Sequence, residues 1–327
     1  MLLDPYKRKI NYLRISVTDR CNLRCRYCMP ESGIDLIPHG EILTYEELLR
    51  IVRVFASEGI SKVRLTGGEP LVRKGIVDFI FHLSQIEQIK DLSLTTNGIL
   101  LKEFAHDLKQ AGLKRINVSL DSLKRERFYQ ITRRDKFQRV WEGIEEGLRV
   151  GLFPVKVNMV AIKGVNDDEI EDFARLTLRL PVTVRYIEYM PSGNGEEWRE
   201  SDILTILQIQ TRLEKIGNLV STPSDRWDGP ARRFRFEGAL GEIGLIGAVS
   251  SHFCGDCNRL RVTPDGKIRT CLFSDDEVDV KEIIRSGGSD HDLKARLLVA
   301  LAAKPERHHI NSHLFKKCQR NMSSIGG

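Results

Sequence analysis

One repeated pattern between Leu13 and Tyr189 restricts the fold of this chain more than any other feature. Short β-branched runs alternate with amphipathic segments of helical period, about every 25 to 35 residues. Parallel strands joined by helices form a sheet with the helices outside it, because such crossovers are right-handed. Six units favour an α/β fold, an incomplete (βα)6 TIM-like barrel. The predicted strands are LRISV from Leu13, KVRLT from Lys62, LSLTT from Leu92, RINVSL from Arg115, VKVNMVAI from Val155 and TVRYIEY from Thr183.

Cap residues predict where helices begin and end. Thr44 precedes YEELLRIVRVFASEG, in which Glu47 completes a capping box, and Gly59 follows the last turn. The regular pattern stops after Pro191. We therefore predict a partial barrel over residues 1–190 and a separate C-terminal α+β extension over residues 191–327.

The extension has its own predicted elements. The hairpin NRLRVTPDGKIRTCLF turns at residues 264–266, where Pro, Asp and Gly are a strong turn signal. The final residues RNMSSIGG have the composition of a flexible tail. The other predicted elements are a helix over 202–216, the strands RRFRF and EIGLIGAV, and a helix over 293–303.

Charge and hydropathy exclude several classes of function. The net charge is +6 with 29% charged residues, which suits an anionic substrate but not a dedicated nucleic-acid binder. No apolar run approaches the roughly 18 residues of a membrane helix, and the N-terminus lacks a signal-peptide core. We expect a cytoplasmic protein without a membrane partner. In a reducing compartment its grouped cysteines are more often metal ligands than disulfides.

The first cysteine group follows the first strand. Cys21, Cys25 and Cys28 have the spacing CxxxCxxC and converge from one loop. Three thiolates leave one iron of a four-iron cluster free to bind something else. A zinc site with a distant fourth ligand is the alternative, although this triple spacing is uncommon for zinc.

This loop resembles the signature of the radical S-adenosylmethionine superfamily, with Tyr27 as the aromatic residue before the last cysteine. The resemblance implies that the open iron binds S-adenosyl-L-methionine and that one electron then yields a 5′-deoxyadenosyl radical. It also places Gly68 of TGGEP at the methionine ammonium group, and Ser119 and Met190 at the nucleoside. A plain strand-to-helix turn and core packing are the structural alternatives for these residues.

The second cysteine group comprises Cys254, Cys257 and Cys271, which the hairpin brings together. Again three cysteines suggest a cluster with one open iron. Zinc is a stronger alternative here, because His252 or Cys318 would complete a ribbon-like site.

Both cysteine groups together with TGGEP and CGDCNRLRVTPDGKIRTCL resemble the GTP 3′,8-cyclase family, over essentially the whole chain. The resemblance implies a lyase of molybdenum cofactor biosynthesis that uses two 4Fe-4S clusters and S-adenosyl-L-methionine. Its substrate is GTP and its product (8S)-3′,8-cyclo-7,8-dihydroguanosine 5′-triphosphate. The second cluster would bind the purine. Implied partners are flavodoxin or ferredoxin as electron donor, cyclic pyranopterin monophosphate synthase as recipient of the product, and a second copy in a homodimer.

Basic residues at the strands then become candidates for the triphosphate, because guanidinium groups pair with phosphate oxygens. Each of them alone is more often a solvated surface charge. Thr95 is a candidate hydroxyl partner, with Thr96 as the alternative. The substrate-binding candidates are Arg14, Lys62, Arg64, Thr95, Lys156, Arg185, Arg259 and Arg261, and the catalytic candidates are Arg14, Gly326 and Gly327.

Two other functions remain open on the sequence. A radical maturase that modifies a peptide would have more C-terminal cysteines than three. A zinc-stabilised nucleic-acid binding protein would leave CxxxCxxC and TGGEP unexplained. No role is assigned to His308, His309 or Cys318.

Overall fold

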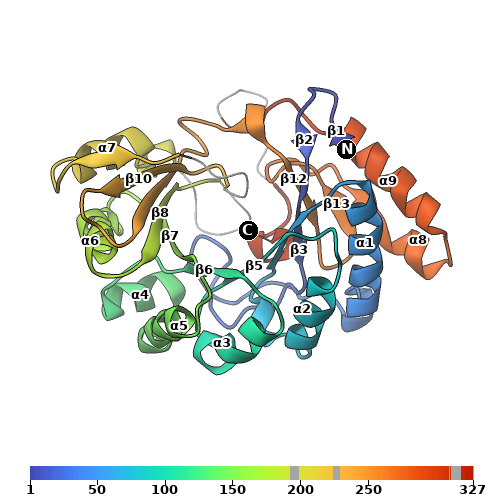
Figure 1. The fold of residues 1–327 in the computed structure, drawn as a ribbon, viewed down its shortest axis with the longest axis horizontal. Helices are drawn as coiled ribbons and strands as arrows, with labels where there is room; N and C mark the ends of the chain where they lie inside the picture. Colours follow the sequence, from blue (N-terminus) through green and yellow to red (C-terminus); the bar gives the residue numbers. More distant parts are fainter. Residues whose placement is uncertain (192–198, 224–228, 309, 311–317, 327) are drawn as a thin grey trace.

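The computed structural model describes residues 1–191, 199–223, 229–308, 310 and 318–326. All six predicted barrel strands are present, and neighbouring strands pair in parallel in sequence order. The predicted α/β partial barrel is therefore confirmed. Figure 1 shows the strands as an incomplete ring with the helices outside it. The strands are β3 (Tyr12–Ser16), β4 (Lys62–Thr66), β5 (Asp91–Thr96), β6 (Arg115–Ser119), β7 (Val155–Ala161) and β8 (Val182–Glu188).

The helices that follow these strands bury one apolar face each against the sheet. The predicted cap of the first helix is confirmed: Thr44 and Glu47 form a capping box, and Gly59 ends the helix with a φ of 123°. The α-helices are α1 (Tyr45–Glu58), α2 (Ile76–Ser84), α3 (Leu101–Gln110), α4 (Arg125–Thr132), α5 (Phe137–Arg149) and α6 (Ile170–Arg179). Short 3-10 helices are η1 (His39–Glu41), η2 (Pro70–Val72), η3 (Asp167–Glu169), η4 (Glu200–Asp202) and η5 (Cys254–Asp256).

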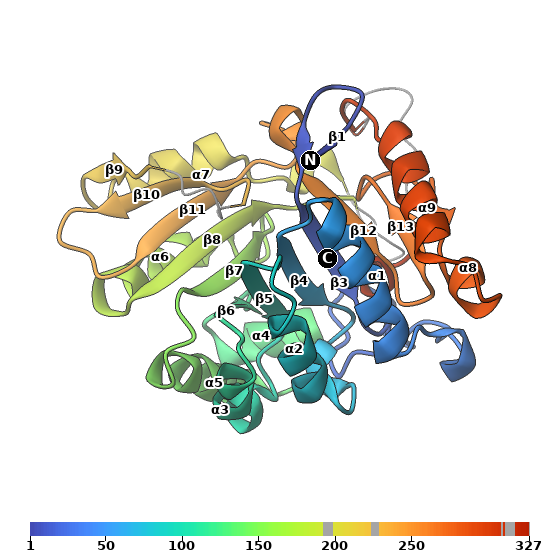
Figure 2. The same ribbon diagram turned by 45° about the vertical axis from the view of Figure 1, so that its right-hand side comes forward.

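Strands of the C-terminal extension continue the same sheet on both of its edges. At one edge β11 (Glu242–Ile246) pairs in parallel with β8, and at the other β12 (Arg259–Val262) pairs in parallel with β3. Figure 2 shows these two additions on opposite sides of the barrel. The division at residue 190 remains a prediction, and the hydrogen-bonded sheet runs across it.

The remaining elements lie outside the barrel strands. The two-stranded sheet β1 (Leu2–Leu3) and β2 (Lys9–Ile10) precedes the barrel and was not predicted. Further strands are β9 (Leu219–Ser221), β10 (Arg232–Phe236), β13 (Lys267–Arg269) and β14 (Val278–Asp279). Further helices are α7 (Ile206–Leu213), α8 (Lys281–Arg285), α9 (Asp290–Ala302) and α10 (Met322–Ile325). Within the described residues, no helix has both the length and the apolarity that crossing a bilayer requires.

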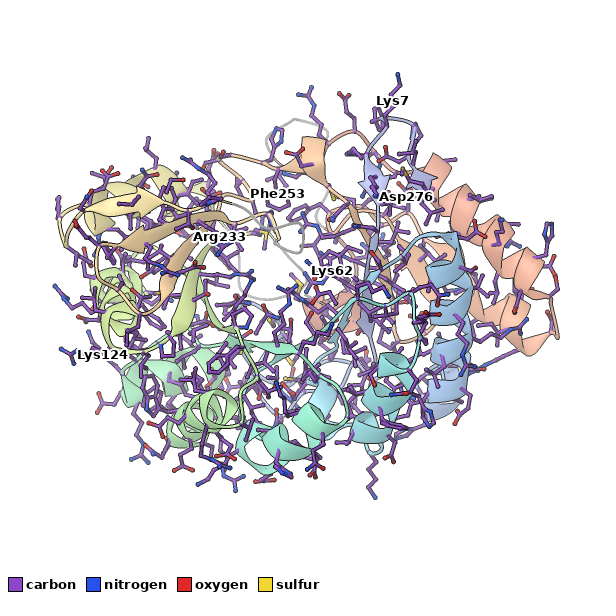
Figure 3. All side chains as sticks on the ribbon, viewed as in Figure 1. Lys7, Lys62, Lys124, Arg233, Phe253 and Asp276 are labelled. Carbon is purple, nitrogen blue, oxygen red and sulfur yellow. The ribbon has the colours of Figure 1, made fainter. Side chains whose placement is uncertain are left out.

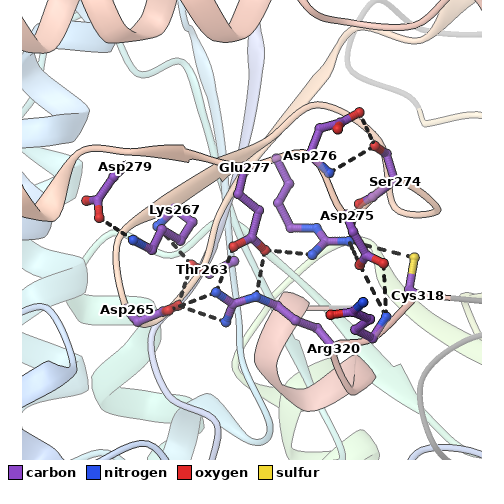
Figure 4. Close-up of polar contacts among 12 residues, drawn as sticks. Thr263, Asp265, Lys267, Ser274, Asp275, Asp276, Glu277, Asp279, Cys318 and Arg320 are labelled. Carbon is purple, nitrogen blue, oxygen red and sulfur yellow. Dashed lines mark hydrogen bonds and ion pairs between the residues drawn. The ribbon is translucent and has the colours of Figure 1, made fainter.

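The C-terminal tail is packed inside the molecule, so the prediction of a flexible tail is wrong for residues 321–326. Helix α10 packs against β3, and Ile325 is 1% exposed. Arg320 anchors the tail through two carboxylates, donating to Asp265 Oδ2 and Glu277 Oε2 over 2.8 Å each (Figure 4). Composition predicts mobility only when no such partners exist.

Candidate functional site

One cavity of about 320 Å³ extends along the barrel interior and is lined by both cysteine groups. The register of two strands sets their separation. Cys257 precedes the start of β12, which pairs Arg259 with Tyr12, while Cys21 follows the end of β3 at Ser16. Four residues of strand span roughly 13 Å. The two groups therefore lie at opposite ends of β3, with the cavity between them.

The first cysteine loop is held by backbone hydrogen bonds to the end of α4. The amides of Arg24 and Arg26 donate to the carbonyls of Thr132 and Ile131, over 3.0 and 2.9 Å. The side-chain amide of Asn97 approaches Cys21 Sγ at 3.8 Å. These contacts fix the loop that carries the three thiols.

The thiols of this loop are buried close to one another. Burial, reinforced by the neighbouring thiols and Asp121, raises the pKa of Cys25 and of Cys28 well above the usual value. Burial also raises the pKa of Cys21, to about 11. A positive centre such as iron would lower these pKa values again and favour the thiolates.

Each cysteine group holds three free cysteines, and this number bears on whether the site takes a cluster or a single ion. Among the residues that the structure describes, no three His, Cys, Asp or Glu side chains lie close enough to ligate one metal ion. Zinc holds all its sulfur ligands about 2.3 Å from one centre, whereas a four-iron cluster spreads thiolates over separate irons. Three cysteines in each group match a four-iron cluster with one open iron, whereas a structural zinc site takes four protein ligands.

The TGGEP turn packs directly against the segment that leads into the cysteine loop. A Cβ on Gly67 would lie 2.7 Å from Thr18 O, and one on Gly68 would lie 2.3 Å from Arg20 O. The glycines are thus required for this backbone contact, a reason that differs from the ligand approach we expected. Gly68 still lines the cavity.

The candidate S-adenosylmethionine residues Tyr27, Ser119 and Met190 line the same cavity. The Tyr27 hydroxyl donates to Asp121 Oδ2 over 2.5 Å, and the amide of Val160 donates to Asp121 Oδ1 over 2.8 Å. Asp121 was missed in the sequence, although it stands two residues after Ser119 at the end of β6. Its position at the carboxyl end of a barrel strand was the available signal.

The predicted hairpin brings the second cysteine group together. Strand pairing of Arg261 with Arg269, extended by two residues, sets Cys271 opposite Arg259. Burial raises the pKa of Cys257, but Arg259 and Lys304 outweigh it and bring that pKa to about 7. The two cations therefore make the thiolate of Cys257 easier to form than that of an ordinary cysteine.

Arginines from three adjacent strands stand in register along the cavity. Arg261 of β12 pairs with Arg14 of β3, which pairs with Arg64 of β4. Across the barrel, Arg185 of β8 is paired with Asn158 of β7. All of the predicted arginines line the cavity. Neighbouring cations in a buried row repel each other unless an anion lies among them.

Several polar atoms on the cavity wall have no hydrogen-bond partner among the described residues. They include Tyr12 Oη, Thr95 Oγ1 and Asn158 Oδ1. Thr96 differs, because its hydroxyl donates to Glu69 Oε1 over 2.8 Å. The structure therefore favours Thr95 over Thr96 as a ligand hydroxyl. Tyr12 and Asn158 were not predicted, and their place on inward positions of barrel strands was the only signal.

Two predicted lysines do not line the main cavity. Lys62 is 2% exposed, 4.4 Å from the Tyr12 ring and 3.7 Å from Asp91 Oδ2. Figure 3 shows it inside the ring of strands, whereas Lys7 and Lys124 lie at the rim. Lys156 lines a second cavity of about 310 Å³ with Arg115 at the opposite mouth of the barrel.

The C-terminal tail contacts the arginine row, which consists of Arg261, Arg14 and Arg64. Arg261 Nη1 donates to Gly326 O, and a Cβ on Gly326 would lie 2.3 Å from Thr66 Oγ1.

The remaining candidates have different positions. Gly327 and His309 lie outside the described residues. His308 lines the cavity beside His252. Cys318 is buried against Arg269 Nη2, at 3.7 Å.

Two family models match consecutive parts of the chain. Residues 15–177 match the radical SAM superfamily, and residues 182–310 match Molybdenum Cofactor Synthesis C. The chain is 50% identical over 327 residues to a GTP 3′,8-cyclase of Heliobacterium modesticaldum, covering 100% of both chains. It is 51% identical to a GTP 3′,8-cyclase of Thermodesulfovibrio yellowstonii and covers 99% of each.

Solved structures share the fold at low sequence identity. Streptococcus suis SuiB bound to S-adenosylmethionine superposes with a TM-score of 0.59 at 15% identity, covering 97% of this chain and 77% of SuiB. SuiB bound to the precursor peptide SuiA gives a TM-score of 0.61 at 15% identity, covering 97% and 76%. These similarities extend to the architecture alone.

Proposed function

We propose, from the premise that the chain belongs to the family of GTP 3′,8-cyclases in the radical SAM superfamily, that it acts on GTP. The reaction is the conversion of GTP to (8S)-3′,8-cyclo-7,8-dihydroguanosine 5′-triphosphate, the first step of molybdenum cofactor biosynthesis. The enzyme uses S-adenosyl-L-methionine and two 4Fe-4S clusters. The opposite placement of two cysteine groups in one cavity carries the assignment.

Cys21, Cys25 and Cys28 would hold the first cluster, and Cys254, Cys257 and Cys271 the second. With S-adenosyl-L-methionine bound, the first site would supply the radical chemistry that removes hydrogen from the ribose 3′ carbon of GTP. Tyr27, Gly68, Ser119 and Met190 would bind that cofactor from the cavity wall.

The arginine row would orient the nucleotide between the two cysteine groups. Arg64 and Arg261 are buried on either side of the half-buried Arg14, and all three would pair with phosphate oxygens. The hydroxyls of Thr95 and Tyr12, which have no partner among the described residues, would each form a hydrogen bond with the substrate. Lys62 and Lys156 would act at longer range, because neither lines the main cavity. Holding both partners in one enclosed site raises their effective concentration and excludes water.

Arg14 and the tail would serve the catalytic step together. Gly326 touches Arg261, the neighbour of Arg14 in the sheet. Gly327 follows it in the chain, and its role stays a prediction.

The partners beyond GTP remain predictions. A flavodoxin or ferredoxin is the expected electron donor, and basic residues Arg24, Arg26, Arg133 and Arg134 beside the first cysteine loop suit an acidic carrier. Transfer of the product to cyclic pyranopterin monophosphate synthase and a homodimer are likewise expected.

The test begins with iron and sulfide analysis of protein purified without oxygen, where we expect about eight irons. Incubation with S-adenosyl-L-methionine, GTP and dithionite should then yield 5′-deoxyadenosine only when GTP is present. Zinc without iron would refute the proposal. Iron with no response to GTP would instead favour a maturase that modifies a peptide.

A further inference from the structure

Lys304 places a buried ammonium group against the second cysteine group. Lys304 follows the end of α9 in the chain, and the residue is 3% exposed. The ammonium donates to Cys257 Sγ at 3.4 Å, to Arg259 O at 3.0 Å and to Thr270 O at 2.7 Å. An ammonium has three N–H donors, so these contacts account for all of them.

The charge of Lys304 is not balanced by a carboxylate. Among the described residues, the ammonium group contacts one sulfur and two carbonyl oxygens and forms no ion pair with Asp or Glu. A buried cation without a counter-ion is costly, so the surroundings must provide negative charge. The available source is the sulfur that Lys304 touches, because thiolates on a four-iron cluster leave a net negative charge.

The contacts also show why the lysine stands at this position. Arg259 begins β12 and Thr270 precedes Cys271, so Lys304 joins both arms of the hairpin next to their cysteines. Arg8 plays a purely structural part nearby: it donates to Cys254 O and to Glu306 O over 2.8 and 2.7 Å. The Arg8 charge is paired with Asp4 at 2.5 Å.

We propose that Lys304 is a positioning residue for the second cluster and that its charge and sulfur contact stabilise the cluster's reduced, more negative form. The proposal rests on the proposed function, because it requires a cluster at Cys254, Cys257 and Cys271. Hydrogen bonds to ligand sulfurs and local charge are what set the potential of such clusters.

The experiment compares four variants of the full chain. Lys304→Met removes charge and donors, and Lys304→Gln removes the charge but keeps two N–H donors. Arg8→Gln removes contacts to the Cys254 carbonyl without touching a sulfur. Lys294→Met is the matched control, because Lys294 lies on α9 with 42% side-chain exposure and pairs with Glu58.

The readout is the reduction potential of the second cluster, followed by electron paramagnetic resonance during a redox titration. Its signal is assigned as the one that persists when Cys21, Cys25 and Cys28 are all replaced by Ala. We expect Lys304→Met to lower the ratio of reduced to oxidised cluster at least tenfold, about 59 mV for one electron. Lys304→Gln should shift it less, and the two controls should not shift it.

The outcomes separate this proposal from the proposed function. Wild-type protein without a second iron cluster would refute the proposed function itself. A wild-type potential in Lys304→Met with full iron content would overturn the role of Lys304 alone. Cluster loss in both Lys304 variants but not in Arg8→Gln supports the proposal, and equal loss in Arg8→Gln overturns it.

Discussion

Arg261 Nη1 donates a hydrogen bond to the carbonyl oxygen of Gly326 over 2.8 Å. This contact connects the end of the chain to the row of Arg261, Arg14 and Arg64, although 65 residues separate Arg261 from Gly326 in sequence. The position of Arg261 in the site therefore depends on the tail, and several consequences of that dependence are measurable.

Substitution of Gly326 by Ala should undock the tail. Gly326 has a φ of 81°, and a Cβ there would meet Thr66 Oγ1 and Ser16. A left-handed conformation costs Ala about 1 to 2 kcal/mol before any collision is counted. We expect product formation to fall at least tenfold with iron content unchanged, measured by chromatography of the reaction. Wild-type rates in Gly326→Ala would contradict the role of the tail.

Arg320→Ala should release the same tail from its other end. Arg320 donates to Asp265 and Glu277, and its side chain is 22% exposed. Hydrogen bonds between charged groups of this kind contribute about 1.5 to 3 kcal/mol each. Amide exchange of residues 322–326 should accelerate at least tenfold. The matched control is Arg125→Ala, which breaks an exposed pair with Asp135 and should leave the tail protected.

Thr95 and Thr96 should respond oppositely to replacement by Val. Thr96→Val deprives the buried carboxylate of Glu69 of a donor and should destabilise the protein by about 1 to 3 kcal/mol in thermal unfolding. Thr95→Val breaks no hydrogen bond among the described residues, so stability should hold while GTP binds about five- to tenfold more weakly. Titration calorimetry with GTP measures the second effect, and equal GTP affinity in Thr95→Val would contradict it.

Affinity for GTP should fall as pH rises through about 8. Burial lowers the pKa of Lys62 to about 8, so this group loses its positive charge there. Burial raises the pKa of Tyr12, but Arg64, Arg14 and Lys62 outweigh it and bring that pKa to about 8. Both ionisations make the site more negative and weaken phosphate binding.

The variant Tyr12→Phe removes one of these ionisations and should flatten the pH profile of GTP binding. Tyr45→Phe is the control: Tyr45 also stacks on a guanidinium, that of Arg73 at 4.1 Å, but burial raises its pKa. An unchanged profile in Tyr12→Phe, measured from pH 7 to pH 9, would show that Tyr12 does not face the nucleotide.

The barrel was predictable because each of its strands is marked by the residues within and next to it. The runs from Lys62 and Arg115 are short, β-branched and bounded by turns, and each became the strand expected. The hairpin of the second cysteine group was also predictable, since its turn residues fix the register that sets Cys271 opposite Arg259.

Features that depend on contacts distant in sequence were not predictable. The tail composition signals mobility, yet Arg320 finds two carboxylates on the hairpin. The sequence suggested a ligand contact for Gly68, and the fold adds a second requirement, the close approach of the backbone at Arg20. Lys304 resembles a helix-end surface lysine in sequence, and only the fold brings it to Cys257. In each case the deciding partner belongs to another part of the chain.

The pairing of β12 with β3 dictates how this protein is completed on the ribosome. Tyr12 is made among the first residues, but Arg259, its neighbour across the sheet, is made near the end. The outer edge of β8 likewise stays unpaired until β11, Glu242–Ile246, has been made. A nascent chain thus carries two bare strand edges, which invite pairing with other chains. We therefore expect a chain that stops before Glu242 to aggregate.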